Sequence, residues 1–329
     1  MCFRIRISAV CEVSVLADGY KKRNNGQINV VISNQKRKSI KKEPLIFESK
    51  QKEVPHQHIA LKEIEQELEA LVGMEEMKKT IMQIYAWIYV NKKREEAGLK
   101  ASRQALHMMF KGNPGTGKTT VARLIGKLFV KMNVLSKGHL IEAERADLVG
   151  EYIGHTAQKT RDLVKKAIGG ILFVDEAYSL GRGGEKDFGK EAIDTLVKHM
   201  EDKQHEFILI LAGYSKEMEY FLSLNPGLHS RFPIVIDFPD YTVTQLMDIT
   251  AMMLKEREYI LSREAERKLE NHLMIIKNTW SPISFSNGRY IRNTLEKSIR
   301  SQAMRLLVND VYDKNELITI RSQDLQFED

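Results

Sequence analysis

Cysteine is nearly absent from this sequence: there are two in 329 residues, Cys2 and Cys11, and both lie near its start. The rest of the chain therefore holds neither a disulfide nor a cysteine metal cluster, and redox chemistry is not expected. Long apolar runs are also missing, since none approaches the roughly 18 residues that a membrane-spanning helix needs. The apolar stretch at 7–17 is broken by Glu12 and lacks a convincing signal cleavage site. These absences predict a cytoplasmic protein with no membrane partner.

An excess of one charge is absent from most of the chain, although the formal net charge is +7. Residues 1–50 hold 11 Lys and Arg against 4 Asp and Glu, whereas residues 51–329 hold 40 of each. A basic segment of this kind is either a solvated tail or a surface for nucleic acid or another acidic partner. Any case for nucleic-acid binding therefore rests on the first 50 residues.

The strongest motif is G-x-x-x-x-G-K-T at 112–119, a P-loop. Its glycines permit a tight turn of backbone N–H groups around an anion, while Lys118 reaches the β and γ phosphates and Thr119 ligates Mg²⁺. An apolar run at 106–110 precedes the loop and a helical pattern follows it, so a helix dipole adds to the anion site. The motif predicts ATP and Mg²⁺ as cofactors. The expected nucleotide-binding residues are Gly112, Asn113, Pro114, Gly115, Thr116, Gly117, Lys118, Thr119 and Thr120.

Short apolar runs alternate with helical patterns after the P-loop. A short strand candidate occurs at 139–142, an unbroken apolar run typical of a buried parallel strand at 171–174, another buried strand at 207–212 and a fifth strand at 234–238. Helical patterns lie between them at 156–168 and 193–200. This alternation predicts an α/β domain with a doubly wound parallel five-stranded sheet. Helical patterns then dominate, at 246–254, 262–276 and 291–306, and predict a smaller second domain that is all or mostly α.

The chain is thus expected to have three parts: a basic extension at 1–55, an α/β domain with its leading helices at 56–240, and a helical domain at 241–329. The extension holds a strand candidate at 27–33 bounded by turn residues, so it contains a small β unit. Two helical patterns precede the P-loop, and Gly73 interrupts them. That bend either serves helix packing alone or places backbone against the base of the nucleotide.

Two adjacent carboxylates end the apolar run at 171–174. Ligands bind at the carboxyl ends of strands in open α/β sheets, so Asp175 and Glu176 are expected beside the P-loop. Asp175 holds Mg²⁺ in this interpretation, and Glu176 polarises the water that attacks the γ phosphate. The second carboxylate indicates hydrolysis rather than binding alone.

With the segments N-P-G-L-H-S-R-F at 225–232 and S-N-G-R-Y-I-R at 286–292, these motifs resemble an AAA+ ATPase of the CbxX/CfxQ group, which includes the red-type Rubisco activase. The similarity runs from about residue 59 to the C-terminus. It implies a P-loop NTPase (AAA+) fold in which the second domain is an α-helical lid. It also implies a homo-oligomeric ring, expected to be a hexamer. Within the group, the chain is most similar to members that act in spore development.

The resemblance also implies roles for three arginines. Arg231 corresponds to an arginine finger that reaches the γ phosphate of a neighbouring subunit, where a guanidinium supplied in trans stabilises the transition state. Arg289 resembles the sensor-2 arginine, and Arg292, one helical turn further on, is the alternative. Tyr214 stands where most AAA+ proteins have a polar sensor-1 residue, so that function is open here.

The segment Tyr152, Ile153 and Gly154 matches the aromatic-hydrophobic-glycine pore loop of ring-forming relatives. An aromatic ring packs against any peptide backbone, and glycine allows the loop to move. Residues 182–185 are a candidate second pore loop. The leading hypothesis is an ATP-driven ring that remodels a protein substrate by pulling peptide through its pore. A nucleic-acid motor or loader, and a nucleotide-dependent switch that does no motor work, are the alternatives.

Overall fold

The structure is a computed structural model that describes residues 59–101, 104–152, 154–182, 187–224, 226–279 and 285–327. The chain divides into two units, Met1–Glu53 and Val54–Asp329, and every described residue belongs to the second. The strand candidate at 27–33 and the rest of the basic extension lie outside the described residues. In the described part, no helix combines the length and apolar character that crossing a membrane requires.

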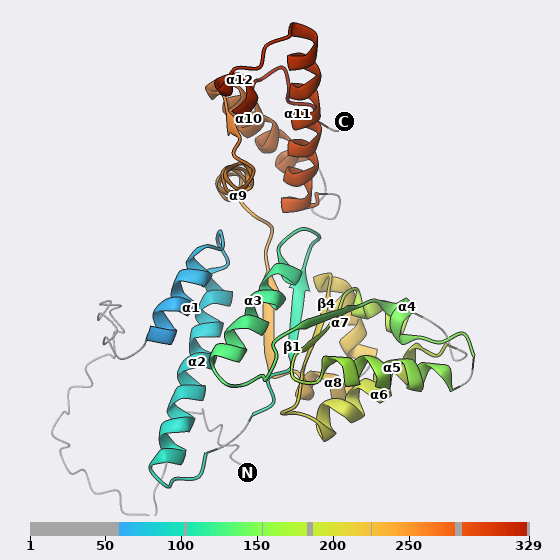
Figure 1. The fold of residues 1–329 in the computed structure, drawn as a ribbon. Coiled ribbons are helices and arrows are strands. Elements are labelled where there is room, and N and C mark those ends of the chain that lie inside the picture. Colours follow the sequence, from blue (N-terminus) through green and yellow to red (C-terminus); the bar gives the residue numbers. More distant parts are fainter. Residues whose placement is uncertain are drawn as a thin grey trace, which may run out of the picture. The chain divides into compact units, whose positions relative to one another are not determined.

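A parallel five-stranded sheet forms the centre of the α/β domain (Figure 1), as predicted. Its strands are β1 (Met108–Gly112), β2 (Leu140–Ala143), β3 (Ile171–Val174), β4 (Ile208–Gly213) and β5 (Ile234–Phe238), in the order β2-β3-β4-β1-β5. β1 pairs with both β4 and β5. The loop after β1 therefore leaves from the interior of the sheet, at the carboxyl edge where ligands bind.

β1 lies two residues later in the sequence than the apolar run predicts. The run at 106–110 includes Leu106 and His107, but the ladder to β5 begins at Met108 and continues to the pair Gly112–Phe238. A β carbon at position 112 would lie 2.3 Å from the carbonyl oxygen of Phe238. Glycine thus allows the strand to extend up to the P-loop itself.

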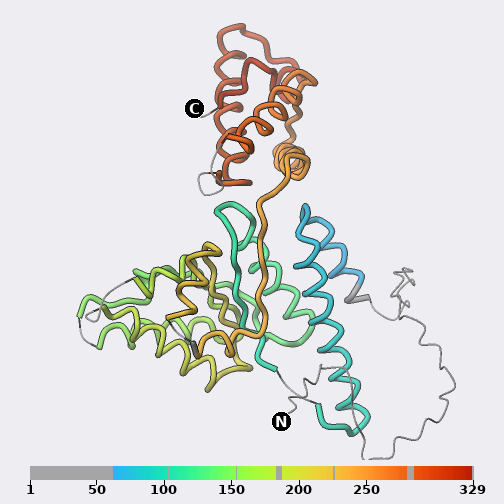
Figure 2. The backbone as a smooth tube through the Cα atoms, turned by 180° about the vertical axis from the view of Figure 1, so that it is seen from behind, coloured from blue at the N-terminus to red at the C-terminus, as the bar shows by residue number. Residues whose placement is uncertain are grey.

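Alternate residues of the strands face two separate cores, one on each side of the sheet. Met108 and Phe110 pack with α1 (Ile59–Glu69), α2 (Glu75–Glu96) and α3 (Lys118–Lys131), whereas Met109 belongs to the other core. Figures 1 and 2 show α1 and α2 side by side near α3. The other core includes residues from α4 (Arg145–Leu148), α5 (His155–Ala167), the 3-10 helix η1 (Ala177–Gly181), α6 (Gly189–Asp202), α7 (Ser215–Leu224) and α8 (Pro226–Arg231).

The lid follows β5, with its first helix beginning at Val243, and is mostly helical, as predicted. Its elements are α9 (Val243–Glu256), β6 (Ile260–Leu261), α10 (Arg263–Thr279), α11 (Asn287–Asn309), α12 (Lys314–Ile318) and β7 (Thr319–Ile320). Thr242 and Gln245 form a reciprocal capping box at the start of α9. The two-residue parallel ladder of β6 and β7 was not predicted, because strands this short show no periodicity.

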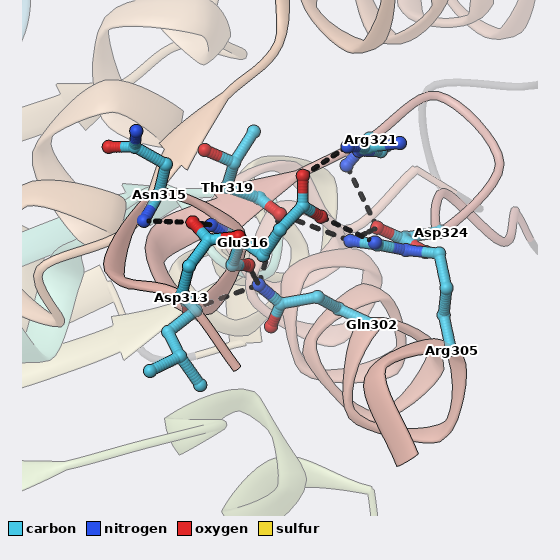
Figure 3. A network of polar contacts seen from close by, with 9 residues as sticks. Gln302, Arg305, Asp313, Asn315, Glu316, Thr319, Arg321 and Asp324 are labelled. Atoms are coloured by element: carbon cyan, nitrogen blue, oxygen red, sulfur yellow. Dashed lines mark hydrogen bonds and ion pairs between the residues drawn. The ribbon is translucent and has the colours of Figure 1, made fainter. Parts of the chain in front are cut away.

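A polar network joins α11 to the end of the lid (Figure 3). The Arg305 guanidinium forms ion pairs with Asp324 at 2.9 Å and Glu316 at 2.8 Å. The Gln302 amide donates to the carbonyl oxygens of Glu316, Leu317 and Thr319 at 2.9–3.1 Å. Buried polar groups must be satisfied in this way, so the network fixes α12 and β7 against α11.

Candidate functional site

The P-loop turns between β1 and α3 through two glycines with left-handed backbone. Gly115 has φ +69° and Gly117 has φ +93°, a region where glycine has no steric penalty. A β carbon at Gly117 would lie 2.8 Å from the Met74 methyl carbon and 3.2 Å from the Tyr241 hydroxyl oxygen. The glycines therefore allow both the turn and the close approach of neighbouring segments.

Every carbonyl oxygen from Gly112 to Thr116 has a hydrogen-bond partner, and the donors come from two sources. Lys118 Nζ donates to the first two carbonyls, of Gly112 at 2.8 Å and Asn113 at 2.9 Å. The next three carbonyl oxygens accept hydrogen bonds from residues outside the loop. Pro114 O accepts from Asn287 Nδ2 at 3.3 Å, Gly115 O from Gly288 N at 3.0 Å, and Thr116 O from the Tyr241 hydroxyl at 3.1 Å. In a trans peptide the N–H points opposite to the carbonyl, so the N–H groups of residues 115–117 point away from the lid contacts.

A cleft of about 290 Å³ lies over the loop. Its lining includes six of the nine expected P-loop residues: Pro114, Gly115, Gly117, Lys118, Thr119 and Thr120. Gly112, Asn113 and Thr116 are not in the lining. Asn113 donates to Asp240 and the Thr116 hydroxyl donates to Asn113 O at 2.8 Å, so these two side chains support the loop rather than face the cleft.

Lys118 is the buried cation of the cleft, with 9% of its surface exposed. Burial lowers the pKa of its ammonium, the nearby charge of Asp175 opposes that shift, and Arg289 adds to it. The Lys118 amine is thus near two carboxylates and a second cation, Arg289.

Asp175 and Glu176 both line the cleft, at the carboxyl end of β3. The Asp175 N–H still belongs to the sheet, because it donates to Ala143 O at 2.9 Å. Glu176 has a left-handed backbone with φ +46°, and its N–H donates to Asp175 Oδ1 at 2.9 Å. This sharp turn directs both carboxylates of the adjacent pair toward the same cleft.

Tyr214 lines the cleft beside the carboxylates, directly after β4. Burial raises the pKa of its hydroxyl, and the charges of Glu176 and Asp175 raise it further. Its ring lies 5.5 Å from that of Tyr178, and burial raises the pKa of Tyr178 as well. A protonated phenol near Glu176 is able to donate a hydrogen bond, so sensor-1 function at Tyr214 stays a prediction with geometric support.

Both lid arginines, Arg289 and Arg292, line the cleft. The Arg289 amide nitrogen would lie 2.8 Å from a β carbon at Gly115, and its charge affects the pKa of both Lys118 and Tyr214. These contacts support Arg289 as the sensor-2 arginine ahead of Arg292.

An apolar wall completes the cleft, with residues from the junction of the leading helices and from α9. It consists of Leu71, Val72, Met74, Ile249, Met252 and Met253. Gly73, with φ +67°, marks the expected break between α1 and α2, and a β carbon there would lie 2.5 Å from Gln245 Nε2. Gly73 itself is not in the lining, whereas residues on both sides of it are. A direct contact of Gly73 with the base stays a prediction.

Arg231 lies outside the lining of this cleft, at the end of α8. Its Nε donates to Glu201 Oε1 at 2.5 Å and its Nη1 to Gly227 O at 2.7 Å. The structure therefore does not bring Arg231 to the phosphate site of its own chain.

Tyr152 is also outside the cleft lining, and 66% of its surface is exposed. Its ring contacts that of His155 at 5.4 Å, and Gly154, with φ +84°, starts α5. Ile153 lies outside the described residues, as do 183–185 of the second candidate loop. Arg182 of that loop lies over the Tyr178 ring at 4.6 Å.

Sequence reasoning assigned no role to Asp240, Tyr241 or Asn287, although all three contact the P-loop. Asp240 and Tyr241 lie at the predicted boundary between the two domains, and Asn287 lies in the segment at 286–292 that contains the sensor-2 candidate. Nothing local in the pattern indicates that these side chains bond to residues more than a hundred positions earlier.

Comparison with known proteins agrees with this geometry. Residues 108–240 match the ATPase family associated with various cellular activities (AAA), and residues 242–329 match the AAA lid domain. Stage V sporulation protein K of Bacillus subtilis (strain 168) is 71% identical over 308 residues, which are 93% of this chain and 96% of that protein.

A more distant relative supports the same family, and a solved structure supports the same fold. The chloroplastic ribulose bisphosphate carboxylase/oxygenase activase of Cyanidioschyzon merolae (strain NIES-3377 / 10D) is 42% identical over 258 residues, covering 78% of this chain and 87% of that protein. Among solved structures, the FIGL-1 AAA domain in complex with ADP superposes with a TM-score of 0.52 at 16% identity, over 77% of this chain and 80% of that one. At this identity the likeness concerns the fold.

Proposed function

Since this chain belongs to the AAA family of ATPases, we propose that it forms a ring, expected to be a hexamer, which uses ATP to draw a protein substrate through its pore. The observation that carries this proposal is Tyr152, a largely exposed aromatic side chain on a loop outside the nucleotide cleft. An aromatic side chain such as that of Tyr152 offers a large contact area for peptide at low entropic cost.

The relatives support two further parts of the proposal. Similarity to a stage V sporulation protein supports a role in spore development. The name of the activase relative indicates a protein target, which supports a protein substrate here. A cytoplasmic location stays a prediction.

The cleft residues divide the ATPase chemistry among them. Glu176 accepts a proton from the attacking water, which bonds to the γ phosphorus while the bond from that phosphorus to the β–γ bridging oxygen breaks, giving ADP and phosphate. Lys118 and the P-loop N–H groups hold the phosphates. Arg289 reports the nucleotide to the lid.

Mg²⁺ fits the oxygen donors that line the cleft. Thr119 and Asp175 both face it, and Mg²⁺ is commonly held by one or two protein oxygens together with phosphates and water. When bound, the ion neutralises charge between the β and γ phosphates. In the proposal, Thr119 and Asp175 are its protein ligands.

Arg231 is proposed to act on a neighbouring subunit. Its position outside its own cleft, at the exposed end of α8, supports a role in trans. Hydrolysis then depends on assembly, because the transition-state charge lacks its guanidinium in an isolated subunit.

Photo-crosslinking from position 152 tests the motor hypothesis. A photoreactive phenylalanine analogue replaces Tyr152 in a Glu176→Gln chain, which is trapped with ATP in sporulating cells. The expected product is a covalent adduct that protease removes and nuclease does not, since the loop is proposed to grip peptide. Tyr220, also 66% exposed but on α7, provides the matched control position.

The outcomes separate the three hypotheses. A nuclease-sensitive adduct from position 152 favours a nucleic-acid motor. Equal yields from positions 152 and 220, or an adduct that does not require ATP, favour a nucleotide switch and contradict the threading mechanism.

A further inference from the structure

A partly buried polar relay connects the P-loop to the first residue of the lid helix α11. Asp240 lies at its centre, between β5 and α9. Its two carboxylate oxygens each accept from Asn113 Nδ2 at 3.0 Å, and its Oδ1 also accepts from Asn287 Nδ2 at 2.7 Å. One carboxylate thus bonds to a P-loop side chain and to a lid side chain.

Asn287 is the lid residue of this relay and is completely buried. Its Oδ1 accepts from the Tyr241 N–H at 3.0 Å, and its Nδ2 donates to Pro114 O at 3.3 Å as well as to Asp240. A buried amide with both ends engaged has a single orientation, because rotation would leave its polar atoms unsatisfied.

The backbone of Asn287 is also fixed in an uncommon conformation. Its φ is +46°, a left-handed value that asparagine adopts more readily than most residues. The following residue, Gly288, donates its N–H to Gly115 O at 3.0 Å. The first turn of α11 therefore rests directly on the P-loop backbone.

We infer that Asn287 is a positioning residue for the phosphate site, which it orients through Pro114 and, through Asp240, through Asn113. This inference rests on the proposed phosphate role of the P-loop. Asn287 contacts no nucleotide in this scheme; it fixes the carbonyls of the loop so that the opposite N–H groups converge on the phosphates.

The relay also implies reciprocal coupling between nucleotide and lid. If the lid contacts favour the phosphate-binding shape of the loop, then phosphate binding must favour the docked lid by the same factor. Arg289 follows Asn287 by two residues, so the same docking sets the position of the sensor-2 candidate.

The test measures ATP affinity of the full chain by calorimetry in three relay variants and two control variants. Asn287→Gly keeps the left-handed backbone accessible and removes the amide, and Asn113→Ala removes the other end of the relay. Each change is expected to weaken ATP binding about tenfold, the effect of one buried hydrogen bond left unmade. The double variant should be weaker than the single ones by less than the sum of their effects, because Asn113 and Asn287 are linked through the same carboxylate, Asp240.

Two controls separate positioning from simple loss of structure. Gln302→Met removes the buried amide of the distal lid network (Figure 3), so it should lower the melting temperature and leave ATP affinity unchanged. Lys118→Ala tests the proposed site itself. If Lys118→Ala binds ATP normally, the proposed phosphate site fails, whatever Asn287 does.

The inference is overturned if the effects of Asn113→Ala and Asn287→Gly on ATP affinity are additive. It is also overturned if Asn287→Gly binds ATP normally while Lys118→Ala loses binding. Amide hydrogen exchange gives a second measurement that does not need the lid variant to fold. ATP should protect the first turn of α11 in the unaltered chain and fail to protect it in Asn113→Ala at saturating ATP. Equal protection in both proteins also overturns the inference.

Discussion

The adjacent carboxylates Asp175 and Glu176 differ in backbone conformation. Asp175 remains in the sheet through its N–H bond to Ala143, whereas Glu176 leaves it with φ +46°. Non-glycine residues rarely adopt positive φ, and such strain is found at functional sites. The conformation separates a carboxylate suited to holding a metal from one suited to acting on water.

Replacing Glu176 by glutamine is expected to preserve ATP binding and to abolish most turnover. The amide has nearly the same shape but accepts no proton, and loss of a general base costs about 10²–10⁴-fold in rate. Phosphate release and ATP affinity measured on the same preparation test this. Glu217→Gln, a partly exposed position on α7 outside the cleft lining, is the control, and equal turnover in both variants would place the base elsewhere.

Residues with a local signature were predictable, and residues defined by distant contacts were not. Lys118, Thr119, Asp175 and Glu176 were expected in one site because glycine spacing and a buried strand are readable within a few positions. Asn287 acts through partners 47 and 173 positions away. No periodicity encodes such contacts, because they arise only when the lid docks.

At the scale of elements, His107, the residue just before β1, is hydrogen-bonded to α6 and to β4. Its Nε2–H donates to Met200 O at 3.0 Å, and its Nδ1 accepts from the Leu209 N–H at 3.0 Å. The bond that Nδ1 accepts requires the neutral ring, and burial lowers the pKa of His107 below its usual value of 6.5. The end of α6 and the start of β4 are thus held by one uncharged imidazole.

The free energy of unfolding should therefore fall on acidification. Below pH 6.5 the unfolded chain binds a proton at His107 that the folded chain does not, so stability is full above that pH and declines toward the lowered folded pKa. His107→Gln has no titrating group there. Urea unfolding between pH 5 and 8 should show the gap between the two proteins narrowing as pH falls, and parallel curves would contradict this.

Most elements were predicted with small shifts, but the ten-residue helix α7 and four shorter elements were not. β3 has the bounds that the apolar run indicates, because all four of its residues are apolar and buried. β5 also has the predicted bounds, although Val235 and Asp237 are exposed. α4, α12, β6 and β7 have two to five residues each. A period cannot be measured over so few positions, so tertiary packing rather than local pattern defines them.

For the whole molecule, Arg231 is the residue whose proposed role requires a second copy of the chain. It pairs with Glu201 at the surface of its own chain instead of facing its own cleft. Exposed ion pairs are worth about 0–1 kcal/mol, so a phosphate of a neighbouring subunit competes easily for this guanidinium.

Mixed assemblies should show whether the arginine acts in trans. Arg231→Ala and Glu176→Gln subunits are each expected to be nearly inactive alone, while a mixture regains part of the turnover. A mixed ring contains interfaces at which an intact Glu176 site meets an intact Arg231. Turnover across mixing ratios, with co-assembly verified by mass, tests this, and no rescue at any ratio would argue against a finger in trans.

The contact between the lid and Gly115 also limits how this sequence can diverge. A β carbon at position 115 would lie 2.1 Å from the carbonyl oxygen of Ser286 and 2.8 Å from the amide nitrogen of Arg289. The lid thus forbids a side chain there, in addition to any demand from the nucleotide. Selection should consequently act on the two segments together, and natural variants that lose glycine at 115 are expected to carry compensating changes at 286–289, which a covariation survey would detect.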